Sequence, residues 1–393
     1  MLRLLAAARL ALNFRLLLLA ALALAGTVAG WRILAEMFAN TDNTILQREM
    51  EANGIWPWES QITPLQPGSL WSPETWQHVN PLMHSWDAIS KPFVQIYRSD
   101  VTLTQWTYWL CCALWSLAIW AFFGGAITRI AAVSFARHEN VSWTKVGNFV
   151  RPRWISYFFA PLMPMLVTFM GAAVLALVGL LTKSEAGLLA AGILWPIVLV
   201  GGFIMAFLLI GLFFSWPLMW AAISTEGTDA FGALSHAYAY VYQRPLRYFL
   251  YGVLAALVGV LGWFVVTQFA YWILQLSYWG VSWGGAADGL AALSESQELG
   301  RLGNTGVQLI RFWNGLLTTL ALAYVFSYFW VATTVIYFLL RREVDATELD
   351  DVFLPEEQQL HGLPPLKTDP DGMVEPADDG PAAADERASS NGG

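Results

Sequence analysis

The residues best suited to chemistry in this sequence are six arginines that flank two turns between long apolar segments. They are Arg129, Arg137, Arg151, Arg153, Arg244 and Arg247. Each basic residue near an anionic membrane surface contributes about 1 kcal/mol to binding, so together they could hold anionic lipid headgroups or an acidic segment of a partner. The simpler interpretation, which we favour, is that they anchor the chain at the cytoplasmic face of a membrane.

Arg129 is the arginine that anchoring explains least well. It precedes the final turns of an apolar run, in the sequence FFGGAITRIAAVSFAR. A charge near the middle of a bilayer is costly, so this side chain must either extend to the interface or find a partner inside the protein.

A second group of polar residues lies in the last apolar segment. Asn314, Thr318 and Thr319 could line a polar crevice. Hydrogen bonds between helices explain the same residues equally well. Aspartate and glutamate are missing from the cores of the apolar segments, whereas transporters normally carry acidic groups there.

Metal binding and catalysis receive little support from the sequence. His78 and His84 are six residues apart, which places them on different faces of a helix, so ordinary surface residues are favoured over a metal site. Cys111 and Cys112 are the only cysteines. Two adjacent cysteines are too few for a disulfide framework or a cysteine-based zinc site. No nucleophile or phosphate-binding motif occurs. We therefore expect no enzyme activity, cofactor or metal.

The composition indicates the elements that must position these residues. Of 393 residues, 56% are hydrophobic and 13% are charged. Apolar runs of about 20 residues cross a bilayer, and several such runs are present. The sequence predicts an all-α integral membrane protein, a bundle of about six transmembrane helices with two cytoplasmic amphipathic elbow helices. The predicted spans are 16–34, 106–132, 156–181, 198–222, 249–274 and 312–340.

Two of these spans have alternative interpretations. The first could be a cleaved secretory signal, but its apolar run is too long for one and we favour an uncleaved span. The segment 187–224 is too long for one simple crossing, and we expect Pro196 and Pro217 to break it into a re-entrant lead and one crossing.

The turns between spans carry helix signals. Ser142 and Thr228 are possible caps of the two elbow helices, and each elbow ends at an Arg-Pro pair. In the second elbow, Phe231, Leu234, Tyr238 and Val241 form the expected apolar face. The segment 41–100, rich in tryptophan and proline, is expected to be an outer loop at the membrane surface.

The last part of the chain differs from the rest. Residues 343–393 contain fourteen acidic residues against Lys367 and Arg387, within a net charge of -8 for the whole chain. We expect a membrane domain, 1–342, followed by a disordered acidic cytoplasmic tail, 343–393. The tail could dock on the basic elbows or on another protein. The sequence has no basic stripe of the kind that binds nucleic acid.

Three stretches together resemble a family of uncharacterised bacterial polytopic membrane proteins. They are FFGGAITRIAAVSFARHE (122–139), RPRWISYFFAPLMP (151–164) and DAFGALSHAYAYVYQRPLRYF (229–249). The resemblance covers about residues 10 to 350 and implies a shared membrane domain, but it implies no activity and no site residues.

We therefore expect a non-enzymatic multi-pass protein of the bacterial cytoplasmic (inner) membrane, with both termini cytoplasmic. Its role would be organisational or that of a subunit of a membrane complex, with lipids and protein partners of the tail as its contacts. The alternative is a small-solute transporter or channel that uses the segments containing proline.

Overall fold

The computed structural model of the chain describes residues 2–39, 44–59, 80–98, 101–284 and 300–354. The chain divides into two units, Met1–Val352 and Phe353–Gly393. Every helix of the described residues belongs to the first unit, and no strand occurs among these residues. The tail expected to be disordered from residue 343 begins with ordered residues, since α12 reaches Val344 and the first unit reaches Val352; beyond Leu354 it lies outside the described residues.

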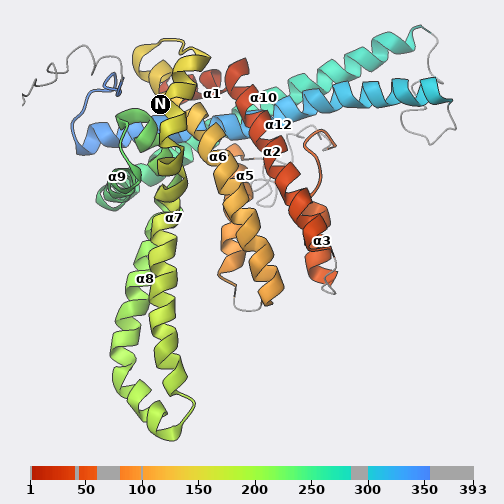
Figure 1. Cartoon of the computed structure of the whole chain (residues 1–393). Coiled ribbons are helices and arrows are strands. Elements are labelled where there is room, and N and C mark those ends of the chain that lie inside the picture. The colour runs from red at the N-terminus through yellow and green to blue at the C-terminus, as the bar shows by residue number, and fades with distance from the viewer. Residues whose placement is uncertain (1, 40–43, 60–79, 99–100, 285–299, 355–393) are drawn as a thin grey trace, which may run out of the picture. The chain divides into compact units, whose positions relative to one another are not determined.

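Six helices are long and apolar enough to cross a membrane, which indicates a multi-pass membrane protein. They are α2 (Phe14–Met37), α6 (Leu103–Arg137), α7 (Trp143–Leu181), α8 (Glu185–Glu226), α10 (Pro245–Ser282) and α12 (Arg301–Val344). Each of the six predicted spans lies inside one of them. Figure 1 shows that α7 and α8 run side by side as one long hairpin, and that α10 and α12 form another.

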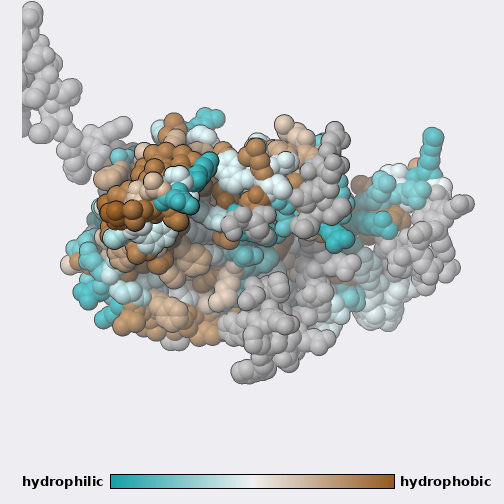
Figure 2. Space-filling view, turned by 90° about the horizontal axis from the view of Figure 1, so that it is seen from below, coloured by the Kyte–Doolittle hydropathy of each residue, from teal (hydrophilic) through white to brown (hydrophobic). Residues whose placement is uncertain are grey.

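Large apolar side chains lie on the outside of these hairpins. Ile193, Phe203 and Phe269 are 73%, 70% and 69% exposed. Figure 2, which views the molecule from below, shows brown apolar residues over much of the visible face. Such a surface is unfavourable in water but matches the hydrocarbon core of a bilayer.

The prolines do not break α7 or α8, so the expected interruption within 187–224 is wrong. Helix α8 continues from Glu185 to Glu226 through Pro196 and Pro217. The first predicted elbow is likewise not a separate helix, because α7 begins at Trp143 and continues through Pro152. Proline is tolerated in transmembrane helices where neighbouring groups satisfy the freed carbonyl. Ser142 caps α7, as predicted.

Helix α12 contacts more of the described helices than its hairpin partner α10 does. It packs against α1 (Leu2–Ala11), α2, α5 (Pro81–Ile96), α6, α8, α9 (Ala230–Gln243) and α10. From Ala321 to Leu340 nearly every side chain is buried, including the large rings of Tyr328, Trp330 and Tyr337. Its other end, at Leu302, Phe312 and Trp313, is exposed. The end that leads to the acidic segment is therefore the rigid one.

Helices α2 and α6 each donate a tryptophan N–H to the other. Trp115 of α6 donates its indole N–H to the carbonyl of Gly26 (2.9 Å), and its ring fills the space beside Gly30, where a Cβ would lie 1.8 Å from Nε1. Trp31 of α2 donates to Oγ of Ser116 in return (2.9 Å). The two glycines thus leave room for an aromatic ring between α2 and α6.

The Trp31 contact gives a first prediction. Replacing Ser116 by alanine leaves the buried indole N–H of Trp31 without its acceptor, so we expect a loss of about 1–2 kcal/mol in the free energy of unfolding. Titration with SDS in mixed micelles measures this loss. Ser277→Ala is the control, because that exposed hydroxyl bonds only to the carbonyl of Ile273 in its own helix. Equal losses in the two variants would contradict the assigned role of Ser116.

The tryptophan-rich segment is not a surface loop over its whole length. It contains α3 (Thr44–Asn53) and α5, which packs against α6, α10 and α12. Ser85 of α5 is buried and donates to the carbonyl of Val325 in the middle of α12 (3.2 Å). A Cβ on Gly259 of α10 would lie 3.4 Å from Pro81. With 16 residues, α5 is about 24 Å long, and its N-terminus lies beside the middle of the long helices.

The second predicted elbow is a separate helix, α9, but its cap and its buried face differ from the prediction. Asp229 is the N-cap and accepts from the N–H of Gly232, in place of Thr228. Phe231 is exposed, while Ala233 and Ala237 are fully buried. Small residues on this face let α9 approach α8 closely, which a row of large apolar residues would prevent.

Candidate functional site at the arginine-rich end

Arg129 is buried, with 4% of its surface exposed, and its partner is the end of helix α8. Its Nη1 donates to the carbonyl of Ser224 at 2.7 Å. Its guanidinium also lies over the ring of Phe149, with Cζ 3.8 Å from the ring centroid. A cation is favourable at this position because the carbonyls at a helix C-terminus carry partial negative charge.

Arg153 contacts the same ring and the same helix end. Its Cζ is 4.3 Å from the centroid of Phe149, and its Nε donates to the carbonyl of Gly227 at 3.4 Å. Gly227 has a φ of 68°, the left-handed conformation that ends many helices and that glycine adopts without strain. Two arginines and one aromatic ring therefore cap α8, which accounts for the charge that the sequence left unexplained.

Three hydroxyl groups are buried beside this cap. Ser224 Oγ lies 2.6 Å from Oγ1 of Thr128 and 2.7 Å from the phenol oxygen of Tyr157. The hydroxyls come from α6, α7 and α8, so they join three helices at one point. Each oxygen is satisfied by a neighbour, so the cluster holds the three helices together.

Glu226 is the acidic centre of the same end. Its carboxylate lies 2.6 Å from Nδ1 of His236 on α9 and 3.2 Å from Nε of Arg341 on α12. It also accepts a hydrogen bond of 2.5 Å from the hydroxyl of Tyr337. The side chains of Glu226 and Arg341 are 12% and 14% exposed, so this pair is largely removed from water. Glu226 thus connects α8, α9 and α12.

Residues 345–352, which we call the strap, follow α12 and are held at both ends. Asp345 accepts a hydrogen bond from the hydroxyl of Tyr240 on α9. Asp351 lies 3.0 Å from Nη2 of Arg341, and its carbonyl accepts from Nη1 at 2.9 Å. Val352 is buried. Burial, reinforced by Asp345, raises the pKa of Tyr240 and keeps its phenol protonated as the donor.

The six predicted arginines do not converge on one binding site. Arg129 and Arg153 cap α8, and Arg247 forms an ion pair of 2.7 Å with Glu343. Arg137 lies in the last turn of α6, Arg151 is exposed on α7, and Arg244 separates α9 from α10. A contact of these residues with lipid or a partner stays a prediction.

The three residues of the predicted polar crevice form hydrogen bonds within the protein. The hydroxyls of Thr318 and Thr319 donate to the carbonyls of Asn314 and Gly315 in their own helix, at 3.0 and 2.8 Å. The amide of Asn314 donates to the phenol oxygen of Tyr278 on α10 at 2.5 Å. These contacts fit hydrogen bonding between and within helices, and a polar crevice at these residues stays a prediction.

Comparison with known proteins adds no assignment. The chain matches no known protein family, no curated protein and no solved structure. The resemblance to bacterial polytopic membrane proteins therefore stays a prediction.

The part of the chain that the structure describes contains no group of three or more His, Cys, Asp and Glu side chains arranged to hold a metal ion. The acidic and histidine side chains near each other in the tryptophan-rich segment are divided: His84 and Asp87 lie on α5, while Glu74 and His78 are outside the described residues.

The sequence analysis missed Glu226, Tyr337 and Arg341 as one cluster. A signal was present, because an acidic residue in the last turn of a helix is disfavoured by the helix dipole and needs a compensating cation. The sequence does not specify which cation is used, because Arg341 is 115 residues away and only the fold brings it close.

Proposed function

We propose that this protein is a non-enzymatic organiser of the bacterial inner membrane, which displays an acidic C-terminal segment from a rigid cytoplasmic base. The observation that carries this proposal is the double attachment of the strap, through Asp345 to α9 and through Asp351 to α12. The attachment holds the chain as far as Val352, the last residue of the first unit.

The charges at this end support a structural role. Arg129, Arg153, Arg247 and Arg341 are engaged with carbonyls or carboxylates of the same chain. Basic residues at the ends of membrane helices favour the cytoplasmic side, which supports a cytoplasmic position of the acidic segment. An acidic segment of this composition suits a basic surface on a partner protein.

Ending the chain after Leu354 tests this proposal. We expect the shortened protein to reach the membrane and to melt at the same temperature as the full chain, while partners captured by cross-linking in cells are lost. A full-length variant with the acidic residues of 356–386 changed to amides is the matched control, because it separates charge from length. Unchanged partners in both variants would refute the role of the segment.

One observation favours the alternative, a small-solute transporter. The N-terminus of α5 lies beside the middle of α10 and α12, and its N-cap residue Asn80 is fully buried. The Asn80 amide nitrogen has no hydrogen-bond partner among the described residues. Transporters use half-length helices of this kind to bring a positive helix N-terminus to a substrate. Solute flux into proteoliposomes that Asn80→Ala abolishes would support this function, whereas no flux across a broad solute panel would remove it.

A further inference from the structure

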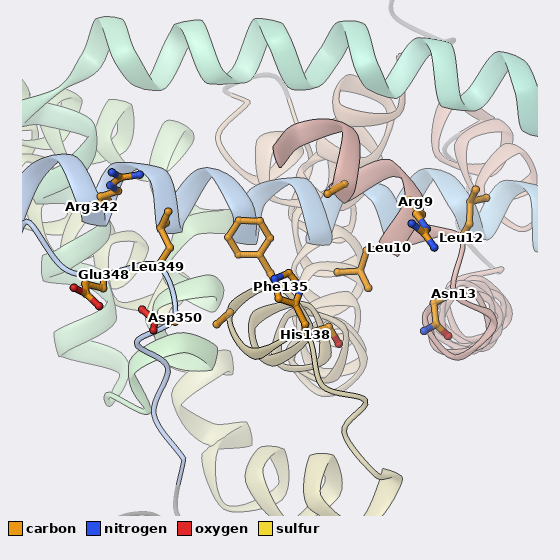
Figure 3. Close-up of a pocket in the computed structure, with 13 residues that line it drawn as sticks. Arg9, Leu10, Leu12, Asn13, Phe135, His138, Arg342, Glu348, Leu349 and Asp350 are labelled. Carbon is orange, nitrogen blue, oxygen red and sulfur yellow. The ribbon is translucent and has the colours of Figure 1, made fainter. Parts of the chain in front are cut away.

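A cavity of about 1050 Å³ lies at the arginine-rich end. It is formed by α1, the end of α6, the end of α12 and the strap. Five of its lining side chains are charged or titratable: Arg9, His138, Arg342, Glu348 and Asp350. Figure 3 shows these residues around the opening.

These five side chains form no hydrogen bond or ion pair with any other described residue. Their immediate neighbours behave differently. Arg341, next to Arg342, pairs with Glu226 and Asp351, whereas Asp350, next to Asp351, faces the cavity. The fold thus uses one member of each adjacent pair for its own stability and leaves the other facing the cavity.

Arg9 and the two carboxylates lie on opposite sides of the cavity. In Figure 3, Arg9 lies with Asn13 on one side, Glu348 and Asp350 lie on the other together with Arg342, and His138 lies between them. The positions of Glu348 and Asp350 are fixed, because the strap is tied at Asp345 and Asp351. A ligand that carries both a negative and a positive group would match this arrangement, whereas a purely anionic ligand would meet two carboxylates.

The cavity also borders an apolar surface. Leu10, Leu12 and Leu349 line it, and Leu12 is 50% exposed. Phe14, which lies outside the lining, is 64% exposed. Phe14 begins α2, the first of the six long apolar helices, so this surface continues into the membrane region. A ligand with a charged head and an apolar body fits both parts.

We propose that this cavity binds the headgroup of a zwitterionic aminophospholipid. The phosphate lies toward Arg9 and the ammonium group toward Glu348 and Asp350, while the acyl chains leave over Leu12 and Phe14. This site differs from the six arginines considered above, and it does not depend on the organising role of the acidic segment.

Native mass spectrometry of the full-length protein with added lipid tests this proposal. We expect phosphatidylethanolamine to bind more tightly than phosphatidylglycerol, and Arg9→Gln to weaken phosphatidylethanolamine binding by about fivefold, the scale of one exposed charge contact. The double variant Glu348→Gln/Asp350→Asn is expected to reverse the preference toward phosphatidylglycerol. Glycerophosphoethanolamine, which has the headgroup without chains, should bind far more weakly if the apolar surface contributes.

Arg151→Gln and Glu139→Gln are the matched controls, because both residues are exposed at the same end but do not line the cavity. They should leave the lipid preference unchanged. Thermal unfolding of every variant checks the fold. Equal binding of the two lipids to the unaltered protein, or an unchanged preference in the double acidic variant, would overturn the proposal.

Discussion

Replacing Glu226 by glutamine is expected to lower the free energy of unfolding by about 3 kcal/mol, the scale of breaking a buried ion pair. The amide still accepts from Tyr337, but Arg341 loses one of its two carboxylates where little water can replace it, and His236 loses its partner. Titration with SDS in mixed micelles, followed by tryptophan fluorescence, measures the loss.

Two further variants make this test specific. Glu343→Gln removes the partner of Arg247, but that guanidinium is 58% exposed, so we expect a loss below about 1 kcal/mol. Combining Glu226→Gln with Arg341→Met should cost less than the sum of the two single changes, because both remove the same ion pair. If Glu226→Gln costs no more than Glu343→Gln, the pair with Arg341 does not hold α8 to α12.

Replacing Gly124 by alanine is expected to destabilise the protein by about 1–3 kcal/mol, although alanine is the better helix former. A Cβ at Gly124 would lie 2.6 Å from the ring of Trp220 and 3.1 Å from the ring of Trp330. These two rings stack with centroids 4.5 Å apart and are fully buried, so neither can move without disturbing the core.

Gly252 is the matched control for Gly124. It lies in the long helix α10, and a Cβ there would meet nothing within 4 Å. We expect Gly252→Ala to be neutral or to stabilise by up to about 1 kcal/mol. The same denaturant titration therefore gives opposite signs for one chemical change, and a gain in both variants would show that α6 is not packed on the two tryptophans as described.

The six long helices were predicted from the sequence because a segment that crosses lipid must be apolar along its whole length. A span must be apolar over about 20 residues, so the six long helices could be found from hydropathy alone. Their ends were harder to predict, since Pro152, Pro196 and Pro217 are acceptable inside a helix when neighbouring residues satisfy the backbone. Helix α5 was missed because its tryptophans and prolines are equally typical of a surface segment.

The candidate site divides in the same way. Arg129 could be singled out from the sequence, because a charge inside an apolar segment is energetically costly. Its contacts with Phe149 and the end of α8 could not, because they depend on how three helices pack. The cavity beside Arg9 was not visible in the sequence at all, because its walls come from both ends of the membrane domain and from the end of α6.

The strap and helix α8 share a single cation, the guanidinium of Arg341, which contacts Asp351 on one edge and Glu226 on another. A load applied to the chain beyond Val352 would therefore reach Arg341 first. From there it would pass through Glu226 to the end of α8, along a path made of two ion pairs. A partner that holds the acidic segment would in this way be mechanically connected to a helix that is far from it in sequence.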